Sequence, residues 1–141
     1  MAEFYSYAGF AYAPPMQFSR GLAWLAGVVL PLVETIRRWH QLGDLRMLPA
    51  WVDDWIIGLL LLGGAWLTRG NRGSGRPALA AAWGFACGMR YMSFFGELQN
   101  PGSVDPSGVP SATVVVINGV LVTLAVAALV ATLRSMPRYR E

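Results

Sequence analysis

The chain has 141 residues, of which 55% are hydrophobic and 13% are charged, whereas roughly 25% of a typical soluble domain is charged. The net charge is +3, all 11 basic residues are Arg, and Cys87 is the single cysteine. This composition excludes a second soluble domain, an intramolecular disulfide and a CxxC redox pair, and it predicts one compact membrane domain. Basic residues that are all Arg, with no Lys, are typical of G+C-rich bacterial genomes.

Residues 1–19 are rich in Phe and Tyr, which predicts an aromatic tail along the lipid headgroups. A docking arm for a partner subunit is the alternative. The first apolar run predicts a span over about 20–38, with Ser19 as the N-cap and a kink or local widening at Pro31. Because no basic residue precedes Arg20, we expect this run to stay in the protein rather than to be cleaved as a signal peptide.

Three further apolar runs predict the remaining membrane helices. They lie at about 51–68, 77–95 and 112–134, and a basic tail follows at 135–141. The predicted fold is an all-α, four-helix transmembrane bundle, with one membrane domain over 20–134. Close helix packing is predicted at Gly84 and Gly88, which have the GxxxG spacing, and at Gly119 on the last span. The helix that meets Gly84 and Gly88 belongs either to this chain or to a partner subunit.

The Arg residues are divided unevenly between the two sides of the predicted bundle. The side with both termini has seven, namely Arg20, Arg69, Arg72, Arg76, Arg134, Arg138 and Arg140. The opposite side has Arg37, Arg38 and Arg46. The positive-inside rule therefore places both termini in the cytoplasm. Since these residues lie mostly at the ends of apolar runs, we interpret them as helix anchors and expect no nucleic-acid partner.

Polar side chains within or beside the spans are the candidate site, because they are unfavourable in lipid and often functional. The candidates are Glu34, Asp53, Asp54, Arg90, Glu97 and Asn118. Antiparallel threading places all of them toward the side away from the termini. Arg90, the deepest basic residue, needs a carboxylate partner, for which Asp54 and Glu34 come first and Asp53 next. Glu34 also precedes Arg37 and Arg38 by three and four residues, so local pairing is expected.

This cluster admits three interpretations. It is an interhelical salt-bridge cluster that fixes the packing, a polar pocket that binds an ion, a proton or a small polar ligand, or a catalytic carboxylate pair. Acid–base catalysis needs two carboxylates in opposed environments, and the adjacent Asp53 and Asp54 at a helix start do not indicate that. We therefore assign no catalytic residue.

His40 is the single histidine, at the end of the first span beside Trp39. One His does not supply two axial haem ligands, and His40 with Asp44 is too few ligands for a typical metal site. We interpret His40 as an interfacial anchor, predict no metal site and leave the cofactor unknown.

Three features of the chain resemble the DoxX-like family of small bacterial inner-membrane proteins. They are Arg20-Gly21-Leu22 at the start of the first span, the run from Gly58 to Gly63 leading to Thr68-Arg69, and an Ala-rich third span. Some members of that family are membrane parts of oxidoreductase systems, so the resemblance implies an accessory role. Asp53-Asp54, Pro31 and the 96–111 loop have no place in this resemblance, and no functional residue is carried over from it.

We expect a small multi-pass protein of a bacterial inner membrane that acts as a non-catalytic accessory or structural subunit of a larger complex. The alternative is a small homo-oligomeric transporter or channel that uses the polar cluster. A membrane enzyme or redox-associated subunit is the third interpretation. The expected partners are the lipid bilayer and either other subunits or further copies of the chain.

Overall fold

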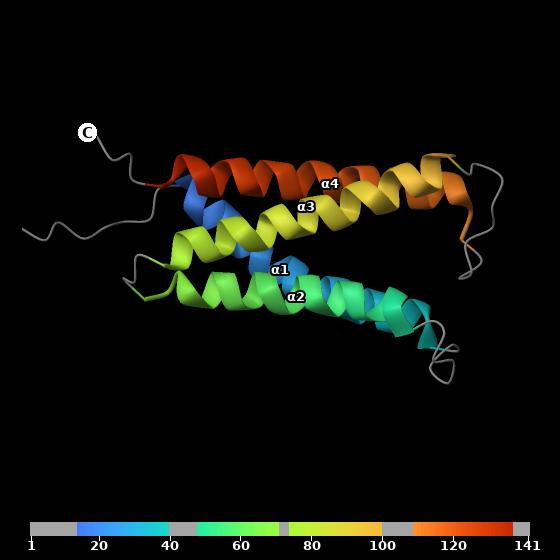
Figure 1. The fold of residues 1–141 in the computed structure, drawn as a ribbon, viewed down its shortest axis with the longest axis horizontal. Helices are drawn as coiled ribbons and strands as arrows, with labels where there is room; N and C mark the ends of the chain where they lie inside the picture. Colours follow the sequence, from blue (N-terminus) through green and yellow to red (C-terminus); the bar gives the residue numbers. More distant parts are fainter. Residues whose placement is uncertain (1–13, 40–47, 71–73, 100–108, 137–141) are drawn as a thin grey trace, which may run out of the picture.

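The computed structural model describes residues 14–39, 48–70, 74–99 and 109–136, and this part of the chain is all-α. It contains four helices (Figure 1), namely α1 Pro14–Arg37, α2 Leu48–Leu67, α3 Gly75–Gln99 and α4 Ser111–Arg134. Each helix runs antiparallel to the next along the chain, and α1 also packs against α4. The start of α1 and the end of α4 therefore lie at the same end of the bundle.

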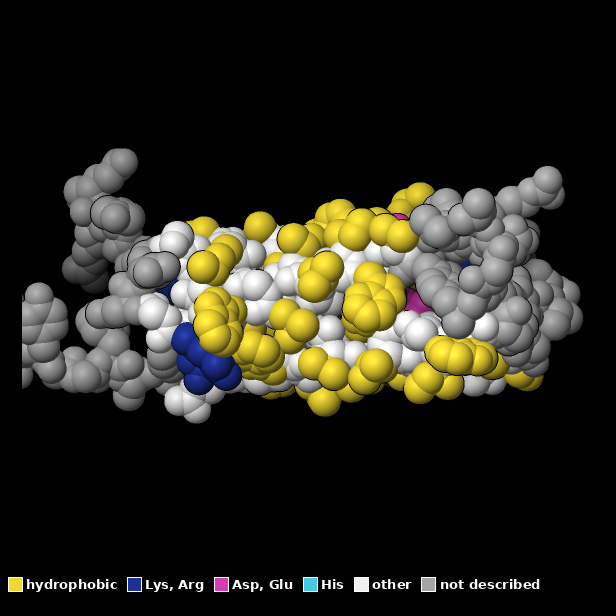
Figure 2. All heavy atoms as spheres, turned by 90° about the horizontal axis from the view of Figure 1, so that it is seen from below, with side chains coloured by type: hydrophobic (Ala, Val, Ile, Leu, Met, Phe, Trp, Pro, Cys, Tyr) yellow, Lys and Arg dark blue, Asp and Glu magenta, His cyan; other side chains and the backbone are white. Residues whose placement is uncertain are grey.

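Large hydrophobic side chains cover the outside of the bundle. On successive helices, Ile36 is 74% exposed, Leu59 63%, Met92 70% and Val116 66%. Figure 2 shows hydrophobic side chains spread along the length of one face, with basic atoms near the end with the termini and acidic atoms near the other. Two helical stretches, Pro15–Arg37 and Ser111–Arg134, are long and apolar enough to cross a membrane. So large an exposed apolar surface marks a membrane or protein contact.

The first helix begins earlier than predicted. Pro14 and Pro15 lie in its first turn, where proline is tolerated because the N–H groups there have no helical acceptor. Residues 14–19, which we assigned to the tail, are therefore helical. The N-cap prediction for Ser19 is wrong, since this residue is inside α1 and fully buried. The rest of the predicted tail, 1–13, lies outside the described residues.

The other helices also extend beyond the predicted spans. Helix α2 begins at Leu48, with Pro49 in its first turn. Helix α3 runs to Gln99, so Glu97, expected just past the helix end, is in its last turn. Polar residues that sequence hydropathy assigns to a loop continue the helix here, because a helical backbone satisfies its own hydrogen bonds beyond the apolar segment.

Two glycines on different helices let α1 and α2 approach closely. A Cβ at Gly58 would lie 2.5 Å from Cγ of Pro31 and 2.8 Å from the carbonyl oxygen of Gly27. A Cβ at Gly27 would lie 2.7 Å from Cγ of Leu62. Neither position has room for a side chain, so these two glycines fix the distance between the helices. Helix α1 continues through Pro31, where a kink or local widening was expected.

The glycines predicted to mediate packing have different environments. Gly84 and Gly88 are exposed, and a Cβ added to either would meet no described atom within 4 Å. At Gly119, an added Cβ would lie 3.2 Å from the ring of Phe94, so this position does lie at the contact between α3 and α4. The helix that meets Gly84 and Gly88 was expected either in this chain or in a partner subunit. No described helix of this chain makes close contact with these two glycines.

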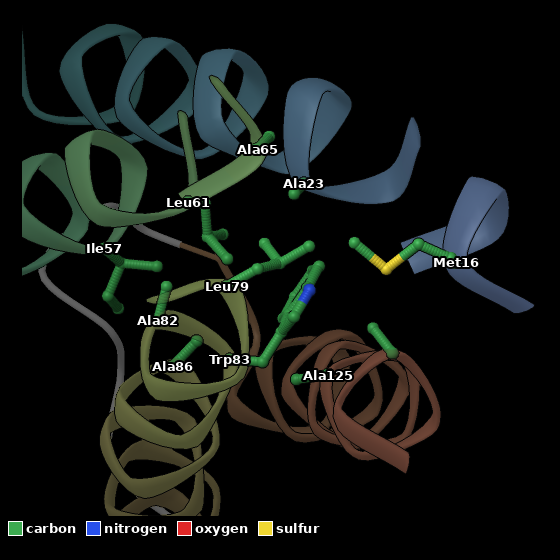
Figure 3. Close-up of a cluster of buried hydrophobic side chains, with 11 residues drawn as sticks. Met16, Ala23, Ile57, Leu61, Ala65, Leu79, Ala82, Trp83, Ala86 and Ala125 are labelled. Carbon is green, nitrogen blue, oxygen red and sulfur yellow. The ribbon is translucent and has the colours of Figure 1, made fainter. Parts of the chain in front are cut away.

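The hydrophobic core occupies the half of the bundle nearest the termini. Figure 3 shows the ring of Trp83 among Met16, Leu79 and Ala125. Small side chains dominate the rest of this cluster, which brings the helices close together; they are Ala23, Ala65, Ala82, Ala86 and Ala128. Since side chains this small leave little space between helices, this half is closely packed.

Buried hydrogen bonds join three helices in this core. The indole N–H of Trp83 donates to the hydroxyl oxygen of Ser19 at 2.9 Å, and the Ser19 and Thr132 hydroxyls are hydrogen-bonded at 2.6 Å. Thr132 also donates to the carbonyl oxygen of Ala128. Every buried polar side chain of this group thus has a partner, as a buried polar network requires.

Candidate functional site: a polar cavity between the four helices

A cavity of about 430 Å³ lies in the half of the bundle away from the termini. Every helix contributes polar side chains to it. All six residues of the predicted cluster line it, namely Glu34, Asp53, Asp54, Arg90, Glu97 and Asn118, together with Arg37, Arg38 and Ser93. The cavity is formed where α1 and α3 end and where α2 and α4 begin.

The antiparallel arrangement explains why these residues meet. Glu34 lies one turn before the end of α1, and Asp54 lies two turns into α2. Arg90 and Glu97 are seven residues apart on α3, so they lie on the same face two turns from each other. Asn118 lies on the buried face of α4, at helical spacing from buried Val114 and Ala125.

Two sets of ion pairs hold the cavity wall. The Arg90 guanidinium donates to the Asp54 carboxylate and joins α3 to α2, and each of these side chains is 13% exposed. The Glu34 carboxylate accepts from Arg37 at 3.0 Å and also pairs with Arg38, both within α1. Of the partners proposed for Arg90, Asp54 makes the contact, while Glu34 is engaged by its own helix.

The adjacent aspartates have different environments. Asp54 is half-buried and bonded to Arg90, whereas Asp53 lines the cavity from an exposed position. Successive residues of a helix point about 100° apart, so only one of the two turns inward. Burial of an ionised carboxylate requires a partner, and the inward aspartate is the one that has it.

Several polar groups of the wall are placed to contact a bound molecule. Oε2 of Glu97 is buried and makes no hydrogen bond with a described residue, and the same holds for Nε of Arg90. Nε of Arg38 also makes no hydrogen bond, but it is ion-paired with Glu34. Asn118 is only 8% exposed and lines the same cavity. A buried polar atom without a partner is unfavourable, so Oε2 of Glu97 and Nε of Arg90 are available to a bound molecule.

The rest of the wall is aliphatic. It consists of Leu30, Val33, Ile57, Met89, Val109, Val114, Ile117 and Leu121, with Gly96. An apolar wall with a few convergent polar groups, in a volume of about 300–1,000 Å³, is typical of small-molecule sites. The cavity has both properties.

The described residues contain no group of three or more His, Cys, Asp or Glu side chains that would hold a metal ion. Cys87 is a free, half-buried thiol on α3. His40, Asp44 and Arg46 lie outside the described part of the chain, as do Arg72, Arg138 and Arg140. The interpretation of His40 as an interfacial anchor therefore stays a prediction.

Sequence reasoning missed two features of this site. Ser93 lies one turn after Met89 on α3 and lines the cavity, but a single Ser in an apolar run carries little signal. The aliphatic wall was also missed, because the apolar residues of a membrane span look alike whether they face lipid or a cavity. The helical spacing of Val114, Asn118 and Leu121 was the available indication.

Comparison of the chain with protein-family models, with curated proteins and with solved structures finds no match. The functional argument therefore rests on the geometry of the cavity.

Proposed function

We propose that this chain is a small multi-pass membrane protein in which all four helices span the bilayer. A helix of 20 residues, the length of α2, extends for about 30 Å, which is the thickness of the hydrocarbon core. Because the four helices lie side by side and their outer surfaces are apolar, a bilayer that surrounds α1 and α4 also surrounds α2 and α3.

We further propose that the termini face the cytoplasm of a bacterial cell and that the cavity faces the outside. The Arg distribution supports this orientation. The contact of Arg69 with the rings of Trp24 and Trp66, at 4.6 and 5.2 Å, supports a lipid–water boundary at the end with the termini. Trp and Arg together are typical of the boundary between lipid and water.

The proposed activity is binding of a small polar ligand by a non-catalytic accessory subunit. The observation that carries it is the cavity itself, since all four helices of a small apolar bundle direct polar side chains into one space of about 430 Å³. A cluster that served packing alone would need no such space. The exposed Gly84 and Gly88 supply a smooth helix face for a partner subunit.

Transport is the less favoured alternative. A route across the bundle would have to pass the half that contains Leu61, Leu79 and Trp83, which are 0%, 0% and 3% exposed. These side chains are packed together, whereas the charged groups that line the cavity lie in the other half. The resemblance to the DoxX-like family stays a prediction, and it agrees with an accessory role.

The topology is tested by labelling single cysteines in cells with a membrane-impermeant maleimide. In a Cys87→Ser background, we expect Ser103→Cys, in the segment between α3 and α4, to react in intact cells. Ser74→Cys, between α2 and α3, should react only after permeabilisation. Reaction of both positions from the same side would overturn the four-span arrangement.

The binding function is tested by native mass spectrometry of the full chain released from its own membranes in mild detergent. We expect a bound small molecule in the wild type and its loss in Asn118→Leu, which replaces the cavity amide by an aliphatic group of similar size. Thr123→Val, at an exposed position on the same helix, is the matched control and should keep the ligand. A wild-type protein that carries neither a ligand nor a partner contradicts the proposal.

A further inference from the structure

The charges of the described residues that line the cavity are not balanced. Among these residues, four carboxyl groups (Glu34, Asp53, Asp54 and Glu97) face three guanidinium groups (Arg37, Arg38 and Arg90), which leaves a formal charge of 4 − 3 = 1 negative unit. A positively charged ligand would neutralise this excess. An anion would increase it.

The guanidinium groups are already engaged. Arg37 and Arg38 both bind Glu34, and Arg90 binds Asp54. Nε of Arg38 and Nε of Arg90 make no hydrogen bond with a described residue, but an anion that drew either guanidinium group away from its carboxylate would leave that half-buried carboxylate without its partner, which is strongly unfavourable. The existing pairs therefore disfavour phosphate, sulfate and carboxylate ligands.

The unpartnered carboxylate oxygen of the wall belongs to a group outside the ion pairs. Oε2 of Glu97 is buried and makes no hydrogen bond with any described residue, whereas the unpartnered Nε atoms of Arg38 and Arg90 belong to guanidinium groups that already face a carboxylate. Asn118, on the neighbouring helix, lines the same cavity and has a carbonyl oxygen that can accept a hydrogen bond. A ligand with several N–H donors can bind both Glu97 and Asn118.

The size and the wall of the cavity favour an organic cation over a metal ion. About 430 Å³ is far larger than a coordinated ion needs, and the described residues hold no cluster of three metal-ligating side chains. Aliphatic residues such as Val33, Ile57 and Ile117 form much of the wall. They match a hydrocarbon portion of the ligand rather than a hydration shell.

We propose that the cavity binds a small alkylammonium ion, with its ammonium group on Glu97 and Asn118 and its alkyl group against the aliphatic wall. This inference rests on the proposed function, since it names the class of ligand that the same cavity takes. The ammonium donates hydrogen bonds to the Glu97 carboxylate and the Asn118 carbonyl oxygen, and no bond is made or broken.

The test uses three probes of equal chain length, n-butylammonium, n-butyrate and n-butanol, with the full-length protein in detergent micelles. Isothermal titration calorimetry measures each affinity, and empty micelles provide the blank for partitioning. We expect n-butylammonium to bind most tightly. Glu97→Gln should weaken its binding by roughly 10-fold or more, since a hydrogen bond to a charged group is lost. Thr123→Val, at an exposed position of α4 that does not line the cavity, should change it by less than about 3-fold.

Each other outcome contradicts a defined part of the proposal. Tighter binding of n-butyrate, or equal binding of all three probes, overturns the ligand class and leaves the binding function intact. Unchanged n-butylammonium affinity in Glu97→Gln, with the far-UV circular dichroism of the wild type, overturns the assignment to Glu97. Binding of none of the probes, with no ligand retained in native mass spectrometry, overturns the proposed function as well.

Discussion

The half of the bundle near the termini and the half around the cavity are built from the same four helices but differ in how closely those helices approach. Near the termini, the facing residues are mostly Ala, and the polar Ser19, Trp83 and Thr132 satisfy one another. Around the cavity, charged residues replace Ala, and ion pairs hold the helices around a space. Side-chain volume and the pairing of polar groups thus explain why the half near the termini is closely packed and the other half encloses a cavity.

The largest effect on this contrast is expected from removing one member of the interhelical ion pair. Asp54→Ala leaves the Arg90 guanidinium half-buried without its carboxylate and should destabilise the bundle by about 3 kcal/mol. Thermal unfolding in detergent measures the loss. The double variant Asp54→Ala, Arg90→Met should recover much of it, because the uncompensated charge is gone. If the double variant is as unstable as the two single losses added together, the pair does not couple α2 to α3.

A somewhat smaller effect is expected at the contact between α1 and α2. Gly58→Leu forces a side chain against Pro31 and the Gly27 backbone and should cost about 1–3 kcal/mol. Gly63→Leu is the matched control on the same helix, because a Cβ there meets no described atom within 4 Å. Equal melting temperatures for the two variants would contradict the close approach of α1 and α2.

In the half near the termini, removing one buried hydrogen bond should reduce the free energy of unfolding only modestly. Trp83→Phe keeps most of the ring but removes the donor to Ser19, which should lower stability by about 0.6–1 kcal/mol. Equilibrium unfolding in mixed micelles measures this difference. Phe85→Leu, a change at an exposed aromatic on the same helix, serves as the comparison and should have little effect. The bond is unimportant if both variants unfold alike.

The smallest effect on the isolated chain is expected at the exposed glycine face. Gly84→Leu meets no described atom and should change the unfolding free energy by less than about 0.5 kcal/mol. If this face binds a partner subunit, the same change should abolish co-purification with that subunit. A variant that is stable and still assembles would show that the face is turned to lipid.

The sequence predicted that the six polar residues lie near one another, because antiparallel helices place them at the same depth in the bundle. The all-α architecture followed from the apolar runs. Helix ends were harder to predict, since local rules favour Ser19 as an N-cap, while its buried hydrogen bond to Thr132 of α4 holds it inside α1. Local preferences are often overridden by tertiary contacts of this kind.

The packing glycines could not be identified because the GxxxG pattern is defined along one helix. The close contact in this fold is made by single glycines on two helices, Gly27 and Gly58, and no spacing rule within either helix reveals which pair will meet. The presence of a cavity could not be predicted either. It depends on the three-dimensional separation of the helices rather than on which residues line them.

Pro31 has a mechanical consequence for the cavity. Since proline has no N–H, the carbonyl oxygen of Gly27, four residues earlier, lacks its helical donor, and it lies against Gly58 of α2, where an added Cβ would be 2.8 Å from it. A helix bends more easily where such a bond is missing. Glu34 and its two Arg partners lie beyond this point, so we expect bending of α1 at Pro31 to change the width of the cavity.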